Sequence, residues 1–171
     1  MQLRYQPAAD RLLWQLRTTS GDLYAVWLTR RMVRLLWPPL AKLVTSAGLA
    51  QEMPHASVLP EAQVMLAQAI RDRPLQGASF AEPFNTEVVA QPLGTEPLLP
   101  EAIDLGPGDG GHGLKLQLRE GGGRSLAMQL SADLATALQR LLEQTLVVAD
   151  WGLVVASAAA DDNSNRPSVL N

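Results

Sequence analysis

The segment LGPGDGGHG at 105–113 comes closest to a chemical motif in this sequence. Glycine-rich loops can cradle a phosphate, but no Gly-Lys-Ser/Thr follows here, and the next residues alternate like a strand. His112 lies near Asp104 and Asp109, which together offer three metal-binding side chains. The other histidine, His55, has none of the spacings that known metal motifs use. We therefore interpret the segment as a wide hairpin loop.

No catalytic arrangement stands out elsewhere. The sequence has no cysteine, and its serines do not occur in a Gly-x-Ser-x-Gly elbow, so neither a cysteine nucleophile nor this serine motif is present. No two carboxylates share one predicted face, as a general acid–base pair would. A site assembled from distant residues stays open. We predict no catalytic residues, no metal site and no cofactor, which favours a binding protein over an enzyme.

The residues best suited to an interaction lie on one face of a predicted hairpin. Residues 11–18 and 22–28 both alternate with the period of a half-buried strand. The outward face carries Trp27, Leu13 and Leu23 where water is expected, and Arg11 and Arg17 flank them. A cluster of exposed apolar residues usually marks an interface. The alternative is that the long connection at 74–100 covers this face, and the sequence leaves both open.

A second predicted hairpin, at 114–130, has the same pattern but an ordinary polar outer face. Its outward cations are Lys115 and Arg119, at the positions that correspond to Leu13 and Arg17. The candidate binding residues are Trp27, Arg11, Arg17, Leu13, Leu23, Lys115 and Arg119.

Each hairpin is preceded by a short strand and followed by a helix. Thr29 and Ser131 are predicted N-caps, because a side-chain oxygen at that position accepts an otherwise unpaired backbone N–H. Apolar residues then recur at helical spacing. Pro38 and Pro39 predict a kink or break after residue 36 or 37, because proline lacks an N–H and clashes with the preceding turn.

The two units share residues as well as pattern. The stretch QLRTTSGDLYAVWLT at 15–29 recurs as QLREGGGRSLAMQLS at 117–131, and six identities align without a gap at an offset of 102. Self-similarity at a fixed offset is the usual mark of repeated architecture. One such unit would leave its sheet and helix half uncovered, so we expect two units to bury these faces against each other.

We therefore predict an α+β fold of two pseudo-symmetric strand–strand–strand–helix units with antiparallel sheets, joined by a helix and a long Pro/Gly-rich connection. The first unit spans 1–48, the connection spans 49–95, and the second unit spans 96–158. A single core is shared by both units. Residues 159–171 are predicted to be a disordered tail because of their polar composition.

Charge is unevenly distributed along the 171 residues. Residues 1–50 hold seven Lys/Arg and two Asp/Glu, a net of +5, whereas residues 51–171 hold seven and fifteen, a net of −8, which sum to −3. Such asymmetry suits an acidic or nucleic-acid partner, or mutual neutralisation within the fold or across a dimer. The absence of an apolar N-terminal segment and of cysteine predicts a soluble, cytoplasmic protein without membrane contact.

These observations predict a non-enzymatic binding or scaffolding protein that acts through protein–protein contacts, with a protein partner or a homodimer. The alternative is a single-stranded nucleic-acid binder that uses the outer sheet face, where Trp27 would stack on a base and the arginines would neutralise phosphates. In coarse topology the predicted unit resembles those of the Whirly and PUR-repeat families of single-strand binders. That resemblance concerns element order alone and assigns no residue a role.

Overall fold

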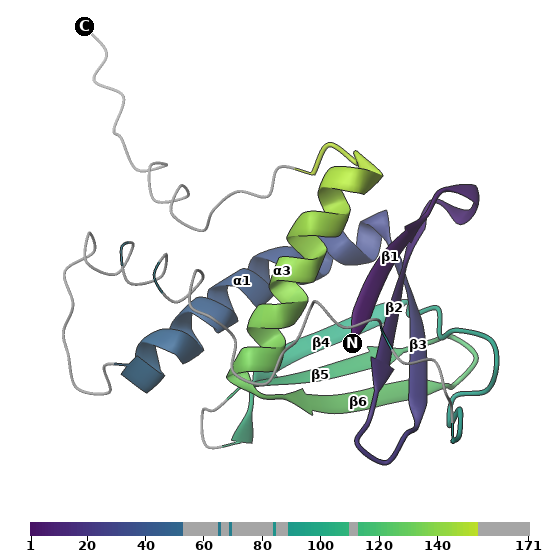
Figure 1. The fold of residues 1–171 in the computed structure, drawn as a ribbon, viewed down its shortest axis with the longest axis horizontal. Helices are drawn as coiled ribbons and strands as arrows, with labels where there is room; N and C mark the ends of the chain where they lie inside the picture. Colours follow the sequence, from purple (N-terminus) through teal and green to yellow (C-terminus); the bar gives the residue numbers. More distant parts are fainter. Residues whose placement is uncertain (53–64, 66–68, 70–83, 85–88, 110–112, 154–171) are drawn as a thin grey trace, which may run out of the picture.

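A computed structural model describes residues 1–52, 65, 69, 84, 89–109 and 113–153. In this part of the chain, two three-stranded antiparallel sheets and two helices form an α+β structure (Figure 1). The first sheet comprises β1 (Gln2–Gln6), β2 (Arg11–Arg17) and β3 (Leu23–Thr29), and helix α1 (Arg30–Glu52) follows it. The second sheet comprises β4 (Ala102–Pro107), β5 (Leu114–Arg119) and β6 (Ser125–Leu130), and helix α3 (Ala132–Ala149) follows it. The predicted α+β class is therefore confirmed.

Several sequence predictions concern residues outside the described ranges. Within the connecting helix predicted from residue 60 onwards, only Met65 and Ala69 are described, and both are helical. Most of the Pro/Gly-rich connection and the whole predicted tail at 159–171 lie outside the described residues.

The strands of the two sheets pair in corresponding register. Trp14 on β2 lies opposite Val26 on β3. Leu116 and Met128, each 102 residues later, lie opposite each other on β5 and β6. The pairing of β1 with β2 and of β4 with β5 is related by the same offset. Corresponding residues therefore occupy corresponding places in the two sheets.

The hairpin turns also correspond. The Gly21 N–H donates to the Thr18 carbonyl at 3.1 Å, and the Gly123 N–H donates to the Glu120 carbonyl at 3.0 Å. Gly21 has a φ of 92° and Gly123 a φ of 87°, values that glycine adopts without the steric cost of a side chain. Each turn thus depends on glycine at the same place.

Both predicted helix caps are confirmed. The Thr29 hydroxyl accepts from the Met32 N–H at 3.2 Å, and the Ser131 hydroxyl accepts from the Leu134 N–H at 3.3 Å. Each bond satisfies a backbone donor that the first helical turn leaves free. In each of the two units, the cap fixes where the backbone leaves the sheet and enters the helix.

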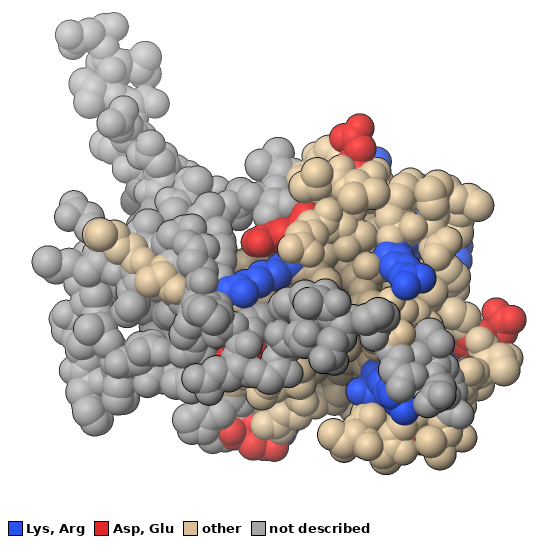
Figure 2. Space-filling model, viewed as in Figure 1, with Lys and Arg blue, Asp and Glu red and all other residues tan. Residues whose placement is uncertain are grey.

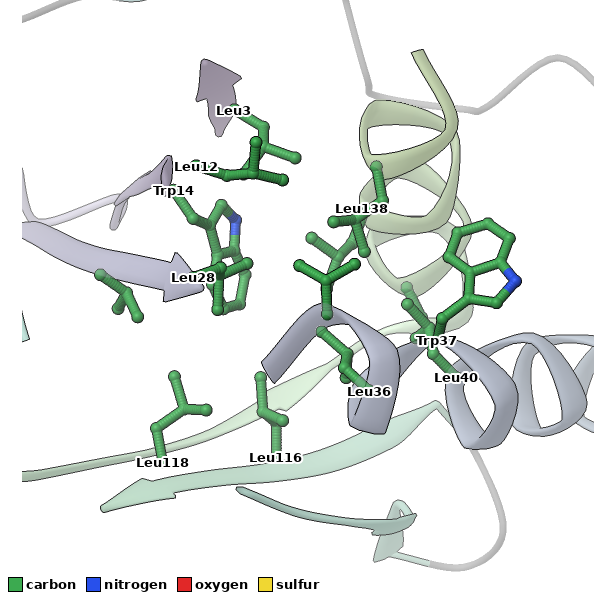
Figure 3. Close-up of a cluster of buried hydrophobic side chains, with 14 of the residues drawn as sticks. Leu3, Leu12, Trp14, Leu28, Leu36, Trp37, Leu40, Leu116, Leu118 and Leu138 are labelled. Atoms are coloured by element: carbon green, nitrogen blue, oxygen red, sulfur yellow. The ribbon is translucent and has the colours of Figure 1, made fainter. Parts of the chain in front are cut away.

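The core lies between the sheets and the helices (Figure 3). Alternate residues of each strand point inward, as the period of two predicted, and Trp14 and Trp37 are both buried. Helix α1 packs against β4 of the second sheet, α3 packs against β1 of the first sheet, and the two helices pack together. Each helix therefore covers part of the other unit's sheet. The largest fully buried side chains are those of Leu12, Trp14, Leu28, Met32, Leu36, Leu40, Leu98, Leu114, Leu116, Leu118, Leu138 and Leu142.

Of the kink or break predicted in helix α1 at its prolines, the break does not occur. The helix is not broken after residue 36 or 37 but continues through Pro38 and Pro39 to Glu52. The missing N–H groups would have bonded to the carbonyls of Arg34 and Leu35. All four residues are exposed, so these carbonyls can bond to water while the opposite side of the helix stays anchored in the core. Leu35 itself is 52% exposed, although it is one of the apolar residues of this helix.

A polar cluster joins the end of the second unit to the first sheet. The Asp10 Oδ1 accepts from the Tyr5 hydroxyl at 2.9 Å and from the Trp151 indole N–H at 2.7 Å. The rings of Tyr5 and Trp151 meet edge to face, with centroids 6.0 Å apart. These hydrogen bonds hold the pKa of Asp10 below its ordinary value, and the bond from Trp151 has the larger effect. The interaction spans 141 positions in sequence.

The corresponding turn glycines provide a matched test of packing. A Cβ at Gly21 would lie 2.6 Å from the Val89 Cγ2, whereas a Cβ at Gly123 would have nothing within 4 Å. Gly123→Ala should therefore show the backbone cost of positive φ alone, about 1–2 kcal/mol. Gly21→Ala should lower the free energy of unfolding by about 1 kcal/mol more, because it also overpacks its site. Urea denaturation measures both, and equal losses would contradict the close approach of Val89.

The Asp10 cluster predicts a dependence of stability on acid. Because the folded pKa is below the ordinary 3.8, the ionised carboxylate stabilises the fold fully above that value. This contribution falls as pH drops through the lowered pKa. Asp10→Asn keeps an acceptor oxygen but has no charge, so it should be less stable than the wild type at pH 7, and the gap should close in acid. Urea denaturation across pH measures the gap; a gap that does not change with pH would contradict the interaction.

Candidate binding face of the first sheet

The outward residues of β1, β2 and β3 form one face of the first sheet, which we call the basic face. Arg4, Leu13 and Trp27 lie side by side in one row across the three strands. The next row contains Gln2, Gln15 and Ala25, and the two glutamine side chains hydrogen-bond at 2.6 Å. An arginine thus borders a Leu–Trp pair in the middle of the sheet.

The charge on this face has one sign. Its strand positions carry Arg4, Arg11 and Arg17 and no aspartate or glutamate. The Nε of Arg17 is buried and has no hydrogen-bond partner among the described residues. Guanidinium groups next to apolar side chains suit an anionic group on a partner.

The two outer faces differ in exposure. The outward residues of β2 and β3 are all half-buried, including Leu13, Leu23 and Trp27. The outward residues of β5 and β6 are all exposed. The sequence predicted an ordinary solvated face for the second sheet, and this exposure confirms it.

Part of the long connection lies at the edge of the first sheet. We call residues 89–99 the edge segment. The Leu98 N–H donates to the Ala25 carbonyl at 2.9 Å, the Trp27 N–H donates to the Leu98 carbonyl at 2.7 Å, and the Leu23 N–H donates to the Ala90 carbonyl at 2.9 Å. The Leu98 side chain is fully buried. The edge segment therefore bonds to the edge of β3 that faces away from β2. Residues 74–88 lie almost wholly outside the described residues, so the alternative in which they cover the basic face is not tested.

An ion pair from the second unit holds the edge segment. Arg124 donates to both carboxylate oxygens of Glu120, at 2.6 and 2.8 Å, and to the carbonyls of Leu93 and Glu96. Glu120 also accepts from the Leu99 N–H at 3.1 Å. The hydrogen bonds from Arg124 and then Leu99 lower the pKa of Glu120. The second hairpin turn thereby holds the edge segment against β3.

Lys115 and Arg119 are not part of the basic face. They lie on β5 in the second sheet, where both are exposed. Lys115 forms an ion pair with Asp109, and the Arg119 Nη2 lies 2.7 Å from the Asp104 Oδ2. The structure thus separates these two candidates from Trp27, Leu13, Leu23, Arg11 and Arg17. On the face of the molecule in Figure 2, described charged side chains of both signs are scattered, with no large patch of one sign.

Two hollows on the surface lack the groups of a reaction site. One, of about 520 Å³, lies over the outer face of the second sheet, where Asp104 and Lys115 line it and already have ion-pair partners. The other, of about 450 Å³, lies between α1 and the end of α3 and contains Arg30 and Arg34 beside apolar side chains. Neither holds a nucleophile with a base beside it.

Within the described ranges, no group of three or more metal-binding side chains occurs. His55 and His112 lie outside those ranges, so the metal alternative weighed for His112 is not tested.

Sequence reasoning missed Arg4. The strand before the first hairpin was predicted, but its faces were not assigned. Alternation along QLRYQ places Leu3 and Tyr5 toward the core and Arg4 outward, beside Leu13. The period of two would therefore have identified Arg4 as part of this face.

Comparison with known proteins leaves the family of this chain open. No family model matches the sequence, and neither the curated proteins nor the solved structures contain a match. Among the described residues, no helix is both long and apolar enough to cross a membrane.

Proposed function

We propose that this chain is a non-enzymatic binding or scaffolding protein that acts through protein–protein contacts, and that the basic face is its contact surface. The observation that carries the proposal is the row of Arg4, Leu13 and Trp27, in which an apolar pair lies beside an exposed arginine. Tryptophan and arginine are the residues most enriched among those that dominate binding energy at interfaces.

The chemistry of the face indicates the kind of partner. Because its strands carry three arginines and no carboxylate, an acidic protein surface would be attracted and a basic one repelled. Leu13, Leu23 and Trp27 would bury an apolar side chain at the centre of such a contact. We therefore propose a partner with carboxylates around an apolar residue.

Single-stranded nucleic acid is the second candidate, because arginines and a tryptophan are also what binds phosphates and bases. Two observations weigh against it. Trp27 is the one aromatic residue on the basic face, whereas strand binding uses successive aromatic platforms. The cations of the second sheet, Lys115 and Arg119, are already paired with carboxylates.

We further propose that the two halves are pseudo-symmetric copies of one duplicated unit. The support is that strand register, turn hydrogen bonds and helix caps all recur at the offset of 102 found in the sequence. The outer faces of the two sheets would then have diverged, so that the first binds a partner and the second is solvated.

Truncation of Trp27 tests the proposed surface. Trp27→Ala should weaken a complex by about 2 kcal/mol or more if the side chain is an anchor. It should cost less stability than Trp14→Ala, which removes a fully buried aromatic side chain at about 3–5 kcal/mol. Chemical denaturation measures stability, and quantitative affinity capture from native lysate, with and without nuclease, measures association.

Gln117→Ala, on the outer face of the second sheet, is the matched control and should leave both readouts unchanged. Proteins captured by the wild type and by Gln117→Ala but lost with Trp27→Ala would support the proposal. A large loss of stability with unchanged capture would make Trp27 a structural residue. Salt-sensitive binding of a labelled oligonucleotide that needs Trp27 would favour the nucleic-acid alternative.

A further inference from the structure

The outer edge of β6 in the second sheet corresponds to the outer edge of β3 in the first sheet, which the edge segment occupies. On β3, the outward backbone groups are those of Leu23, Ala25 and Trp27, and the edge segment bonds to all three residues. Because β5 and β6 pair in the same register 102 residues later, the corresponding outward groups on β6 belong to Ser125, Ala127 and Gln129.

No described segment pairs with this side of β6. The strand is the last in the order β4-β5-β6, and it forms the outer border of its sheet in Figure 1. Ser125, Ala127 and Gln129 are all exposed, and Met128, the counterpart of the fully buried Val26, is only half-buried. Among the described residues, β6 therefore has no counterpart of the edge segment, whose Leu98 bonds to β3.

The β6 edge also lacks the protection that edge strands normally have. Exposed edges are usually blocked by charged residues, by proline or by a bulge. The sequence of β6, SLAMQL, has no charge and no proline, and its pairing with β5 is continuous. The opposite edge of the same sheet, β4, carries Asp104 and ends at Pro107, and α1 packs against it.

We propose that β6 pairs with β6 of a second copy of this chain, antiparallel, around a twofold axis at Ala127. In that register, Ala127 lies opposite the partner's Ala127, and Ser125 lies opposite the partner's Gln129. Every outward N–H and C=O of the three residues then has a partner, as in a regular antiparallel ladder. The two second sheets become one continuous sheet.

The side chains favour a copy of the same strand as the occupant. On the outer face, Ser125, Ala127 and Gln129 are small or uncharged, so the twofold axis brings no like charges together. On the inner face, Leu126 lies opposite the partner's Met128, which buries the apolar surface that Met128 still exposes. The cations beside this strand, Lys115 and Arg119 on β5 and Arg124 before β6, each form an ion pair within their own chain. This dimer uses a surface separate from the basic face and goes beyond the proposed function.

The experiment combines sedimentation equilibrium with two variants at the axis. Ala127→Lys places two like charges opposite each other and should raise the dimer dissociation constant at least about tenfold, less so at high salt. Ala127→Ser, the control, keeps the backbone N–H and a small side chain and should leave the dimer unchanged. Circular dichroism establishes that both variants keep the fold.

Hydrogen exchange on the unaltered chain gives a second readout. The amides of Ser125, Ala127 and Gln129 should exchange more slowly as concentration rises, because pairing protects them. The amides of Leu23 and Trp27, which are already bonded to the edge segment, should not change. A chain that remains monomeric at about 100 μM overturns the proposal. A dimer that Ala127→Lys leaves intact, or one that leaves the three β6 amides unprotected, also overturns it.

Discussion

The reciprocal packing of the helices is the constraint on which the rest of the structure depends. A three-stranded sheet with one apolar face cannot bury that face alone, and a helix with an apolar stripe has the same need. Here α1 crosses to β4 and α3 crosses to β1, while both helices pack against each other. Trp14, Leu36, Leu116 and Leu138, which come from both units, thus belong to one core (Figure 3).

Two groups of polar contacts outside the core join the two units. At one end, Asp10 accepts hydrogen bonds from Tyr5 and from Trp151, beyond the end of α3. At the other, Arg124 and Glu120 of the second hairpin hold the edge segment that bonds to β3. These polar contacts do not follow the offset of 102: the edge segment bonds to β3, and no described segment bonds to the corresponding edge of β6. Among the described residues, the two sheets therefore differ at this edge and on their outer faces.

Local pattern predicted much of the fold because each rule involved near neighbours. Alternation identified the inward faces, and the hydroxyls of Thr29 and Ser131 identified the helix starts. The helix does not break at Pro38 and Pro39, because the cost of a missing hydrogen bond depends on whether the carbonyl faces water, which the sequence does not state. The sequence also predicted that the units share a core without indicating which helix covers which sheet. The pairing of Asp10 with Trp151 joins residues that no periodicity relates.

The candidate surface was only partly predictable for the same reason. Alternation placed Leu13, Trp27, Arg11 and Arg17 on one face, and the strand pairing bears this out. Lys115 and Arg119 were grouped with them by charge alone, although they occupy another sheet and have acidic partners close by. Whether an arginine is free to bind depends on carboxylates brought near by folding, so the charge of a residue type says little before its neighbours are known.

The crossing of the helices has a consequence for synthesis of the protein. The ribosome releases the chain from its N-terminus, so β1, β2 and β3 emerge first, whereas α3 begins 103 residues after β3 ends. During that interval β1 lacks the helix that covers its apolar side, and an uncovered sheet is prone to aggregate. Native contacts of such long sequence separation also slow folding, because loop closure precedes the gain from packing. We therefore expect the nascent first unit to be most prone to aggregation in the interval before the second unit has been translated.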